Sequence, residues 1–380
     1  MNLELTEEQI AVRDAARDFA QNVLKEGVIE RDETQTFPAE QMKQMGELGF
    51  MGMMVSPEYG GGGMDTISYV LAMEEISKVD ASASVCMSVN NSLFCWGLDK
   101  FGTEEQKQKF LVSTAQGKTI GAFCLSEPEA GSDATSQRTT AFDQGDHYLL
   151  NGTKNWITNG STSSYYIVIA QTDVEKGHKG INAFIVEKGM EGFVVGAKEN
   201  KLGIRGSDTH TLMFSDVKVP KENRIGEDGF GFKFAMKVLS GGRIGIAAQA
   251  LGIASGAMEL AVAYSKEREA FGKPIHQHQA IAFKLADMAT EIEAARLLCF
   301  KAASLKDAGQ NFDKLSAMAK VYASKVAMEV TVEAVQVHGG YGFVKEYHVE
   351  RLMRDAKITQ IYEGTTEVQK IVISRALLSE

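Results

Sequence analysis

The sequence predicts an α+β protein of three domains, with helical domains on either side of a central β-domain. The chain opens on an amphipathic pattern of helical period, and short runs rich in β-branched and aromatic residues gather between residues 165 and 219. None of the five prolines lies beyond Pro274, so the remainder of the chain can form long helices. With 380 residues the chain is also too long for one small core. We place the domains at residues 1–120, 121–230 and 231–380.

The N-terminal domain begins directly as a helix, MNLELTEEQIAVRDAARDFA, in which Thr6 and Gln9 have the spacing of a capping box. No basic flank with an apolar core is present there, so we expect neither a signal nor a transit peptide, and a cytoplasmic protein. The stretch SPEYGGGGM (56–64) interrupts the helical pattern, and we expect a loop. We find no apolar run long enough to cross a bilayer, which predicts no membrane insertion.

The central β-domain is predicted from short strands separated by turn signals. The turn signals include Asn151-Gly152, Glu191-Gly192 and Ser215-Asp216. The strands are YYIVIA (165–170), NAFIVE (182–187), GFVVGA (192–197) and HTLMFSDVKV (210–219). Together they indicate a β-domain of modest size.

The C-terminal domain is predicted from two long helical patterns. Residues 284–300 place apolar side chains on one face at helical period: Leu285, Met288, Ile292 and Ala295. Residues 312–338 behave in the same way and stop at Gly339-Gly340.

Charge and cysteine usage exclude several classes of function. The net charge is −10 with no dense run of Lys or Arg, which argues against a nucleic-acid partner. The four cysteines do not form a Cys-x-x-Cys pair and have no His at metal-ligand spacing, so we expect reduced, mostly buried thiols. His276 and His278 have no third ligand nearby in sequence, and we expect no metal site.

The common nucleotide motifs are also missing. The tripeptide GKT at 117–119 would need a glycine at position 112 to form a P-loop, and that residue is Val112. No Gly-x-Gly-x-x-Gly follows any predicted strand, so a dinucleotide would have to bind outside a doubly wound fold.

The stretch IYEGTTEVQK (361–370) admits two interpretations. Thr365 or Thr366 could cap a helix with Glu367 in its first turn. Alternatively, Glu363 is a base that faces a ligand, and Gly364 allows that ligand to approach the backbone closely. The residues of this stretch alone leave both open.

Five segments together resemble the flavin-dependent acyl-CoA dehydrogenase family, and the resemblance runs from the first helix to the last. They are FCLSEPEAGSD (123–133), NGTKNWITNG (151–160), YSKEREAFGKPI (264–275), VHGGYGF (337–343) and RDAKITQIYEGTTEVQK (354–370). The resemblance implies a helical domain, a β-barrel and a C-terminal four-helix bundle, with FAD as cofactor and a homotetrameric assembly. Within the family, SVNNSLF (88–94) is most similar to the short-chain, butyryl-CoA type.

The same resemblance implies the residues that bind FAD. The loop that wraps the isoalloxazine would include Phe123, Leu125, Ser126, Gly131 and Ser132, where relatives usually have threonine in place of Ser126. Beside the ring would lie Trp156, Ile157 and Thr158. The phosphates would be met, typically on a neighbouring subunit, by Arg268, Phe271 and Gln279. The adenosine half would meet Gln336, Val337, Gly339 and Gly340, and under the dinucleotide would lie Thr365, Thr366 and Glu367. Without the resemblance, Trp156 would be expected to pack in a core and Arg268 to be a surface charge.

In this family the residue matching Glu363 removes the substrate α-proton while flavin N5 takes the β-hydride. The backbone N–H of that residue and a ribityl hydroxyl of FAD polarise the thioester carbonyl. A carboxylate buried beside an acyl chain and a flavin is expected to have a raised pKa. A subset of the family carries its base just before the arginine matching Arg243, but that position here is Gly242.

The resemblance also suggests substrate contacts at Ser132, Arg243, Asn90 and Gly364. For Ser132 and Arg243 the alternatives are a turn serine and a helix-surface arginine. The motif SVNNSLF would line the bottom of the acyl pocket, where one methylene more or less changes binding by about 1–3 kcal/mol. We therefore expect oxidation of acyl-CoA with short straight chains of about four to six carbons. Electrons would pass to an electron-transferring flavoprotein. The alternatives are branched-chain or glutaryl-CoA specificity, an oxidase that uses oxygen, and a helical scaffold or acyl-CoA-binding module without catalysis.

Overall fold

The computed structural model describes residues 4–379. Helices fill the first part of the chain, and the expected capping box is present, with the Thr6 hydroxyl accepting from the Gln9 N–H at 3.2 Å and the Gln9 amide accepting from the Thr6 N–H at 3.0 Å. The helices are α1 (Glu7–Phe19), η1 (Ala20–Leu24), α2 (Val28–Thr34), α3 (Ala39–Glu47), η2 (Pro57–Tyr59), α4 (Thr66–Val79), α5 (Ala81–Ser88), η3 (Val89–Cys95), α6 (Trp96–Phe101), α7 (Glu104–Gln106), η4 (Lys107–Leu111) and α8 (Val112–Ala115).

The segments α5, η3 and α6 follow one another without a break, and η3 is a π-helical stretch. A π-helical turn is wider than an α-helical turn and is often found at a functional site. In η3, Asn90 and Asn91 direct their amides to backbone groups of neighbouring segments, so SVNNSLF joins the N-terminal domain to the first strand of the β-domain.

One eight-stranded mixed sheet forms the middle of the chain, in the order β6-β7-β3-β2-β4-β5-β8, with β1 also paired to β4. The strands are β1 (Gly121–Cys124), β2 (Thr140–Asp143), β3 (His147–Thr158), β4 (Tyr165–Gln171), β5 (Ile181–Glu187), β6 (Phe193–Lys198), β7 (Thr209–Pro220) and β8 (Arg224–Ile225). Only Thr140 and Gln171 pair β2 with β4, so the sheet folds there into two halves. Side chains of both halves share one apolar core, as expected for a barrel-like domain.

Two of the predicted turns do not end a strand. They lie opposite each other as irregularities in the pairing of β3 with β7. Asn151-Gly152 lies inside β3 at a register shift, and Ser215-Asp216 lies inside β7. Asp216 has φ +54°, and its N–H donates to the Asn151 side chain at 2.8 Å. These turn-forming residues therefore bend the β3–β7 pair and do not end either strand.

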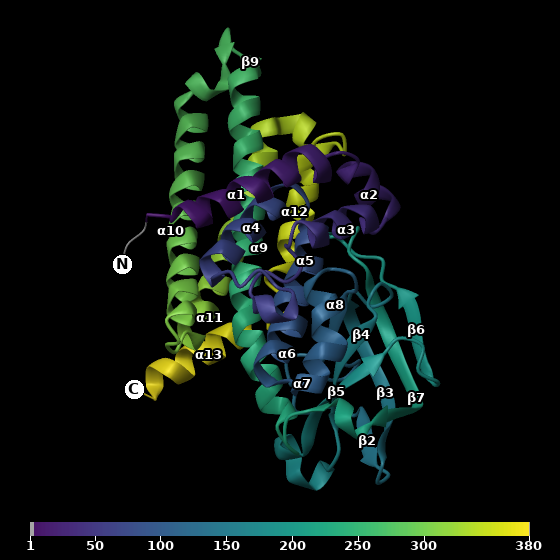
Figure 1. The fold of residues 1–380 in the computed structure, drawn as a ribbon. Coiled ribbons are helices and arrows are strands. Elements are labelled where there is room, and N and C mark those ends of the chain that lie inside the picture. Colours follow the sequence, from purple (N-terminus) through teal and green to yellow (C-terminus); the bar gives the residue numbers. More distant parts are fainter. Residues whose placement is uncertain (1–3, 380) are drawn as a thin grey trace.

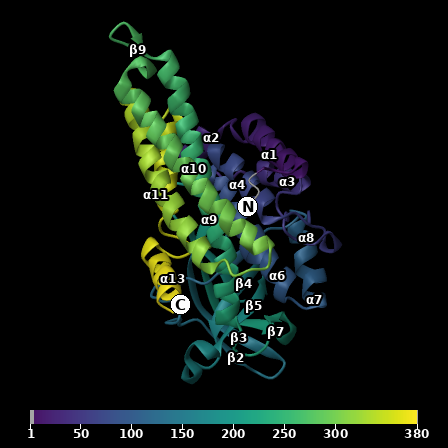
Figure 2. The ribbon, with the colours of Figure 1, turned by 90° about the vertical axis from the view of Figure 1, so that its left-hand side faces the viewer.

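Long helices form the C-terminal part: α9 (Gly231–Glu267), α10 (Gln279–Asp307), α11 (Asp313–His338), α12 (His348–Ile358) and α13 (Thr366–Leu378). A small hairpin of β9 (Glu269–Ala270) and β10 (Lys273–Pro274) caps the outer end of α9 and α10 (Figures 1 and 2). Short 3₁₀ turns lie in this part at Ile275–Gln277 and Gly339–Phe343, and between strands of the β-domain at Val174–Gly180 and Lys221–Asn223. The predicted inner face of α10 is confirmed, because Met288, Ile292 and Ala295 are buried and Leu285 packs, partly buried, against the same core.

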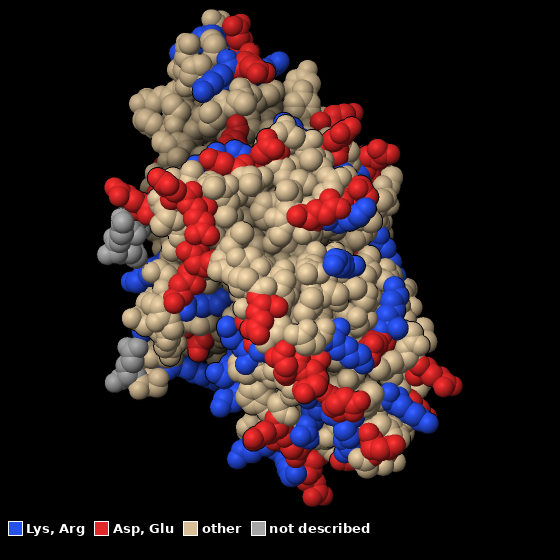
Figure 3. Space-filling model, viewed as in Figure 1, with Lys and Arg blue, Asp and Glu red and all other residues tan. Residues whose placement is uncertain are grey.

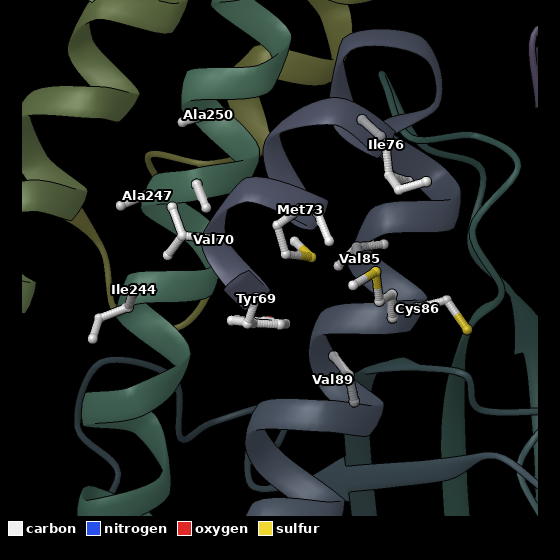
Figure 4. Packing of buried hydrophobic residues seen from close by; sticks show 14 of the residues in the cluster. Tyr69, Val70, Met73, Ile76, Val85, Cys86, Val89, Ile244, Ala247 and Ala250 are labelled. Carbon is white, nitrogen blue, oxygen red and sulfur yellow. The ribbon is translucent and has the colours of Figure 1, made fainter. Parts of the chain in front are cut away.

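The apolar helix α9 packs against the N-terminal domain, where it meets α4 and α5 in the main hydrophobic core (Figure 4). By length and composition alone, α9 could cross a membrane, so the expectation that no such run exists was wrong. Its most apolar stretch is 72% buried inside the protein, which is the burial of a core helix.

The β-domain and the β9–β10 hairpin lie at opposite ends of the molecule (Figures 1 and 2). We propose boundaries near residues 120 and 230, since helices give way to strands between Ala115 and Gly121, and strands to helices between Ile225 and Gly231.

The four cysteines are buried and unpaired, as expected. On the face drawn in Figure 3, Lys and Arg are interspersed with Asp and Glu, without a continuous basic area.

Candidate active site

Glu363 lies on a left-handed turn between α12 and α13. Its φ is +51°, and that of Gly364 is +92°. A side chain at Gly364 would be strained by this φ, and its Cβ would overlap the Gln369 amide. Thr365 caps α13, because its hydroxyl oxygen accepts from the Val368 N–H at 3.3 Å. The helix-start interpretation is therefore confirmed, and it leaves Glu363 outside the helix.

Glu363 is half-buried, and one oxygen of its carboxylate is closed off from water. Its Oε2 is buried and has no hydrogen-bond partner among residues 4–379. Gly242 of α9 lies so close that a Cβ there would overlap Oε2 and would also crowd Leu93 of η3. Burial raises the pKa of Glu363 to about 7, against the opposing effects of Lys320 and Arg243. A carboxyl group with this pKa can accept and release a proton near neutral pH.

Two buried cations lie near this carboxylate. Arg243 of α9 is 7% exposed, and within the described part of the chain its Nε has no partner, so the alternative of a helix-surface arginine is wrong. Lys320 of α11 is 1% exposed, and its Nζ donates to the Gly364 carbonyl at 2.7 Å. Burial lowers the pKa of Arg243, and it lowers the pKa of Lys320 to about 8. The Glu363 carboxylate thus lies beside Gly242 and Leu93 with two positive charges nearby.

Trp156 lies at a bulge of β3, where the pairing with β7 shifts between Lys154 and Ile157. Its φ is +63° and its side chain is 62% exposed. A large aromatic residue rarely adopts this φ, and core packing does not explain it here because the ring is exposed. The bulge presents a flat apolar surface suited to a planar ligand.

A buried ion pair ties β3 to the loop that follows β1. The Nζ of Lys154 donates to Glu127 Oε1 at 2.7 Å and to the Leu125 carbonyl at 3.0 Å, and both charged side chains are almost fully buried. Glu127 in turn accepts from the N–H groups of Arg138 at 2.6 Å and Thr139 at 3.1 Å. Both ends of this loop therefore meet at one ion pair.

The other residues expected around the flavin ring differ in exposure. Phe123 and Ile157 belong to the hydrophobic cores, so a ligand can reach mainly their backbone groups. Leu125 packs against the main core. Exposed or half-buried, and so open to a ligand, are Ser126, Gly131, Ser132, Thr158, Thr366 and Glu367.

A second group of expected cofactor residues surrounds a cavity of about 830 Å³ at the outer end of α9 and α10. The Arg268 guanidinium lies over the Tyr341 ring, 5.7 Å from its centroid. Phe271 has φ +53° and is 96% exposed. The cavity is also lined by Val337, Gly339 and Gly340, whereas Gln279 and Gln336 are exposed residues outside this lining. This end of the molecule lies far from α13, which Glu363 precedes (Figures 1 and 2).

The expected substrate contact at Asn90 needs correction. Asn90 is fully buried, and its amide donates to the carbonyls of Met51 at 2.7 Å and Thr114 at 3.2 Å. Its Oδ1 accepts from the Gly121 N–H at 2.8 Å. Because these bonds engage both ends of the amide, we assign Asn90 to the junction between η3 and β1. Within the same motif, Leu93 lies beside Gly242, which is next to the Glu363 carboxylate.

Sequence reasoning did not single out several residues of this site. Glu127, Lys154 and Gln369 lie inside segments that carry the family resemblance, but they were given no role, and Lys320 lies in an ordinary helical pattern. Lys154 and Lys320 are unusual because lysines are rarely buried. Their burial depends on segments that are far apart in the sequence, so it could not be predicted from local patterns.

Sequence models of the three acyl-CoA dehydrogenase domains match most of the chain. The N-terminal domain matches residues 6–118, the middle domain residues 122–217 and the C-terminal domain residues 229–378. The chain is 54% identical to a short-chain specific acyl-CoA dehydrogenase of Clostridium acetobutylicum over 374 residues, covering 98% of this chain and 99% of the relative.

Two solved structures have nearly the same backbone. One is butyryl-CoA dehydrogenase from Megasphaera elsdenii, with 52% identity and a TM-score of 0.98. The other is a chain from a study of the electron transferring flavoprotein of Acidaminococcus fermentans and flavin-based electron bifurcation, with 53% identity and a TM-score of 0.99. Each comparison covers 100% of this chain and 100% of the other.

Proposed function

The chain belongs to the acyl-CoA dehydrogenase family, and from that premise we propose that it oxidises the Cα–Cβ bond of short-chain acyl-CoA to give trans-2-enoyl-CoA. One observation carries this proposal. The Glu363 carboxylate has a buried Oε2 without a partner in the described chain, a pKa of about 7, and a place beside Gly242 and Leu93. We propose that the reaction takes place in the cytoplasm.

FAD is the cofactor that family membership implies, and two parts of the structure suit it. The exposed Trp156 ring on its bulge suits the flat isoalloxazine, and Thr158 is close by in the same strand. Arg268, beside the cavity at the outer end of α9, suits a phosphate because a guanidinium can donate two parallel hydrogen bonds. When bound, FAD would supply the acceptor for the β-hydride.

The chain itself would position the substrate and move the α-proton. Glu363 takes that proton, and its raised pKa makes the protonated product less costly than it would be for an exposed carboxylate. The Glu363 backbone N–H has no hydrogen-bond partner in residues 4–379, so it is free to donate to the thioester carbonyl oxygen. Ser132 and the buried Arg243 remain our proposed contacts to the CoA moiety, with Gly364 beside the acyl group.

We propose a homotetramer in which one subunit completes the cofactor site of another. Trp156 belongs to β3 of the β-domain and Arg268 directly precedes the β9–β10 hairpin, and these two parts lie at opposite ends of one chain (Figures 1 and 2). One copy therefore does not bring the two groups together. The electron acceptor would be an electron-transferring flavoprotein, since a chain of 53% identity was solved in a study of such a protein.

Packing beside Glu363 supports a short acyl chain. About one helical turn beyond Gly242, a Cβ at Gly245 would lie 2.7 Å from both the Ser88 and Tyr69 hydroxyl oxygens. Close contact between α9 and the α4–α5 pair therefore limits the space next to the base. We expect anaerobic butyryl-CoA to bleach the bound flavin with a higher kcat/KM than octanoyl-CoA, by about tenfold or more. A preference for octanoyl-CoA, or for a branched or dicarboxylic thioester, would refute the short-chain assignment, and rapid peroxide formation would favour an oxidase.

The pKa of Glu363 predicts how the reaction depends on pH. The base must be ionised, so below a pH of about 7 the value of kcat/KM for butyryl-CoA should fall about tenfold per pH unit. Above that pH the rate should level off. A flat profile between about pH 5.5 and 8 would contradict the assigned pKa.

A further inference from the structure

The two carbonyls of the turn that carries the base are held by side chains of other segments. Gln369 Nε2 donates to the Glu363 carbonyl at 3.1 Å and to the Gly364 carbonyl at 2.9 Å. Lys320 Nζ, from α11, donates to the same Gly364 carbonyl at 2.7 Å. Within the described chain, no backbone N–H bonds either carbonyl, so these side chains fix the turn.

Such support matters because the turn is strained. Glu363 has a left-handed φ that residues with a side chain rarely adopt, and such a conformation persists only where its surroundings enforce it. Gln369 is fully buried and Lys320 almost so, which leaves neither free to bond water in place of the carbonyls. The direction of the Glu363 side chain and of its N–H therefore depends on both donors.

A hydrogen bond alone does not explain a lysine at position 320. Burying an ammonium group is costly, and a neutral donor would hold the carbonyl with less desolvation. No carboxylate forms an ion pair with Lys320 among residues 4–379. Among its charged neighbours are Arg243, which it does not pair with, and Glu363, whose ionised form the ammonium favours.

Resting on the function proposed above, we propose that Lys320 is a positioning residue for the catalytic base, holding the turn through the Gly364 carbonyl and favouring the carboxylate form of Glu363. Arg243 from α9 also favours the ionised form of Glu363, and the Glu363 carboxylate in turn raises the pKa of Tyr69 from α4 and of the adjacent Tyr362. Both tyrosines are neutral near pH 7, since burial raises the pKa of each. Arg243 stays charged, so Lys320 is the residue of this set whose charge can be removed while the proposed CoA contact is kept.

The test compares Lys320→Gln, Lys320→Arg and Lys320→Met with the wild-type holoenzyme. In Lys320→Gln, which keeps a donor but loses the charge, the acidic limb of the pH profile should move up by about one unit. At a pH on the acidic limb, Lys320→Gln should then react about tenfold more slowly than the wild type, with flavin content unchanged. In Lys320→Arg, which keeps the charge, the acidic limb should lie at the wild-type pH. In Lys320→Met, which loses both charge and donor, the limb should shift as in Lys320→Gln and the rate at high pH should also be lower. An unshifted limb in Lys320→Gln would overturn the proposal.

A matched control is Lys201→Gln. Lys201 also lies largely buried and donates to a backbone carbonyl, that of Ser207 at 2.9 Å, but in the segment before β7. Its replacement should leave the pH profile in place. If it shifts the limb equally, loss of any buried lysine would explain the result and the proposal fails.

A second measurement does not depend on the substrate. Infrared difference spectra can follow the carbonyl stretch of a protonated carboxyl group during a pH titration, with Glu363→Gln assigning the signal. The midpoint for Glu363 should be higher by about one unit in Lys320→Gln, and an equal midpoint would refute the role of Lys320. If butyryl-CoA leaves the wild-type flavin unreduced while this midpoint shifts, the proposed function is wrong and the electrostatic coupling remains.

Discussion

Replacing Glu363 with glutamine should slow flavin reduction by butyryl-CoA by about 10²- to 10⁴-fold. Glutamine has nearly the same size and can adopt the same turn, but its amide cannot accept a proton at neutral pH. The carboxylate Oε2 has no partner among residues 4–379, so the substitution breaks no bond at that atom. Stopped-flow absorbance under anaerobic conditions measures the rate directly.

The control for this experiment must separate chemistry from folding and cofactor loss. Flavin content and the melting temperature of Glu363→Gln should match the wild type, because the backbone of the turn is held through its carbonyls. Glu346→Gln, which alters an exposed carboxylate before α12, should react at the wild-type rate. Near-normal reduction in Glu363→Gln would show that another group is the base.

The elements that the sequence predicted best are those with one dominant local signal. The buried run YYIVIA became β4, Tyr165–Gln171, and Thr365 caps α13 through its own side chain. Errors arose where local and long-range preferences compete. Asn151-Gly152 has the composition of a turn, but pairing with β7 keeps it inside β3 as a bulge.

The site was only partly predictable for a related reason. The proposal that Glu363 is the base came from the family resemblance, and burial raises its pKa in the direction that we expected. Its contacts with Lys320 and Gly242 join α11 and α9 to the last turn before α13, and no local pattern encodes them. For Asn90 the resemblance suggested a contact with the substrate, but its amide bonds backbone groups and joins segments of the fold.

Replacing Lys154 with methionine should destabilise the protein by about 3–5 kcal/mol, because it leaves the Glu127 carboxylate buried without its counter-charge. The pair is nearly inaccessible to water, with side-chain exposures of 0% for Lys154 and 2% for Glu127. Urea unfolding followed by circular dichroism measures the loss. Lys188→Met, which alters an exposed lysine after β5, should change the stability by only about 0.5 kcal/mol or less.

The double variant Lys154→Met/Glu127→Leu separates stability from the order of the loop. An apolar pair of similar volume often replaces a buried ion pair without loss, so stability should return to within about 1–2 kcal/mol of the wild type. The bonds to the Leu125 carbonyl and to the Arg138 and Thr139 N–H groups would remain absent. FAD should therefore still bind more weakly, by about tenfold or more, since three hydrogen bonds that order the loop are lost and even one bond to a charged group is worth about 1.5 kcal/mol. Full recovery of FAD affinity along with stability would mean that the ion pair supports the fold alone and that the flavin loop is ordered by other contacts.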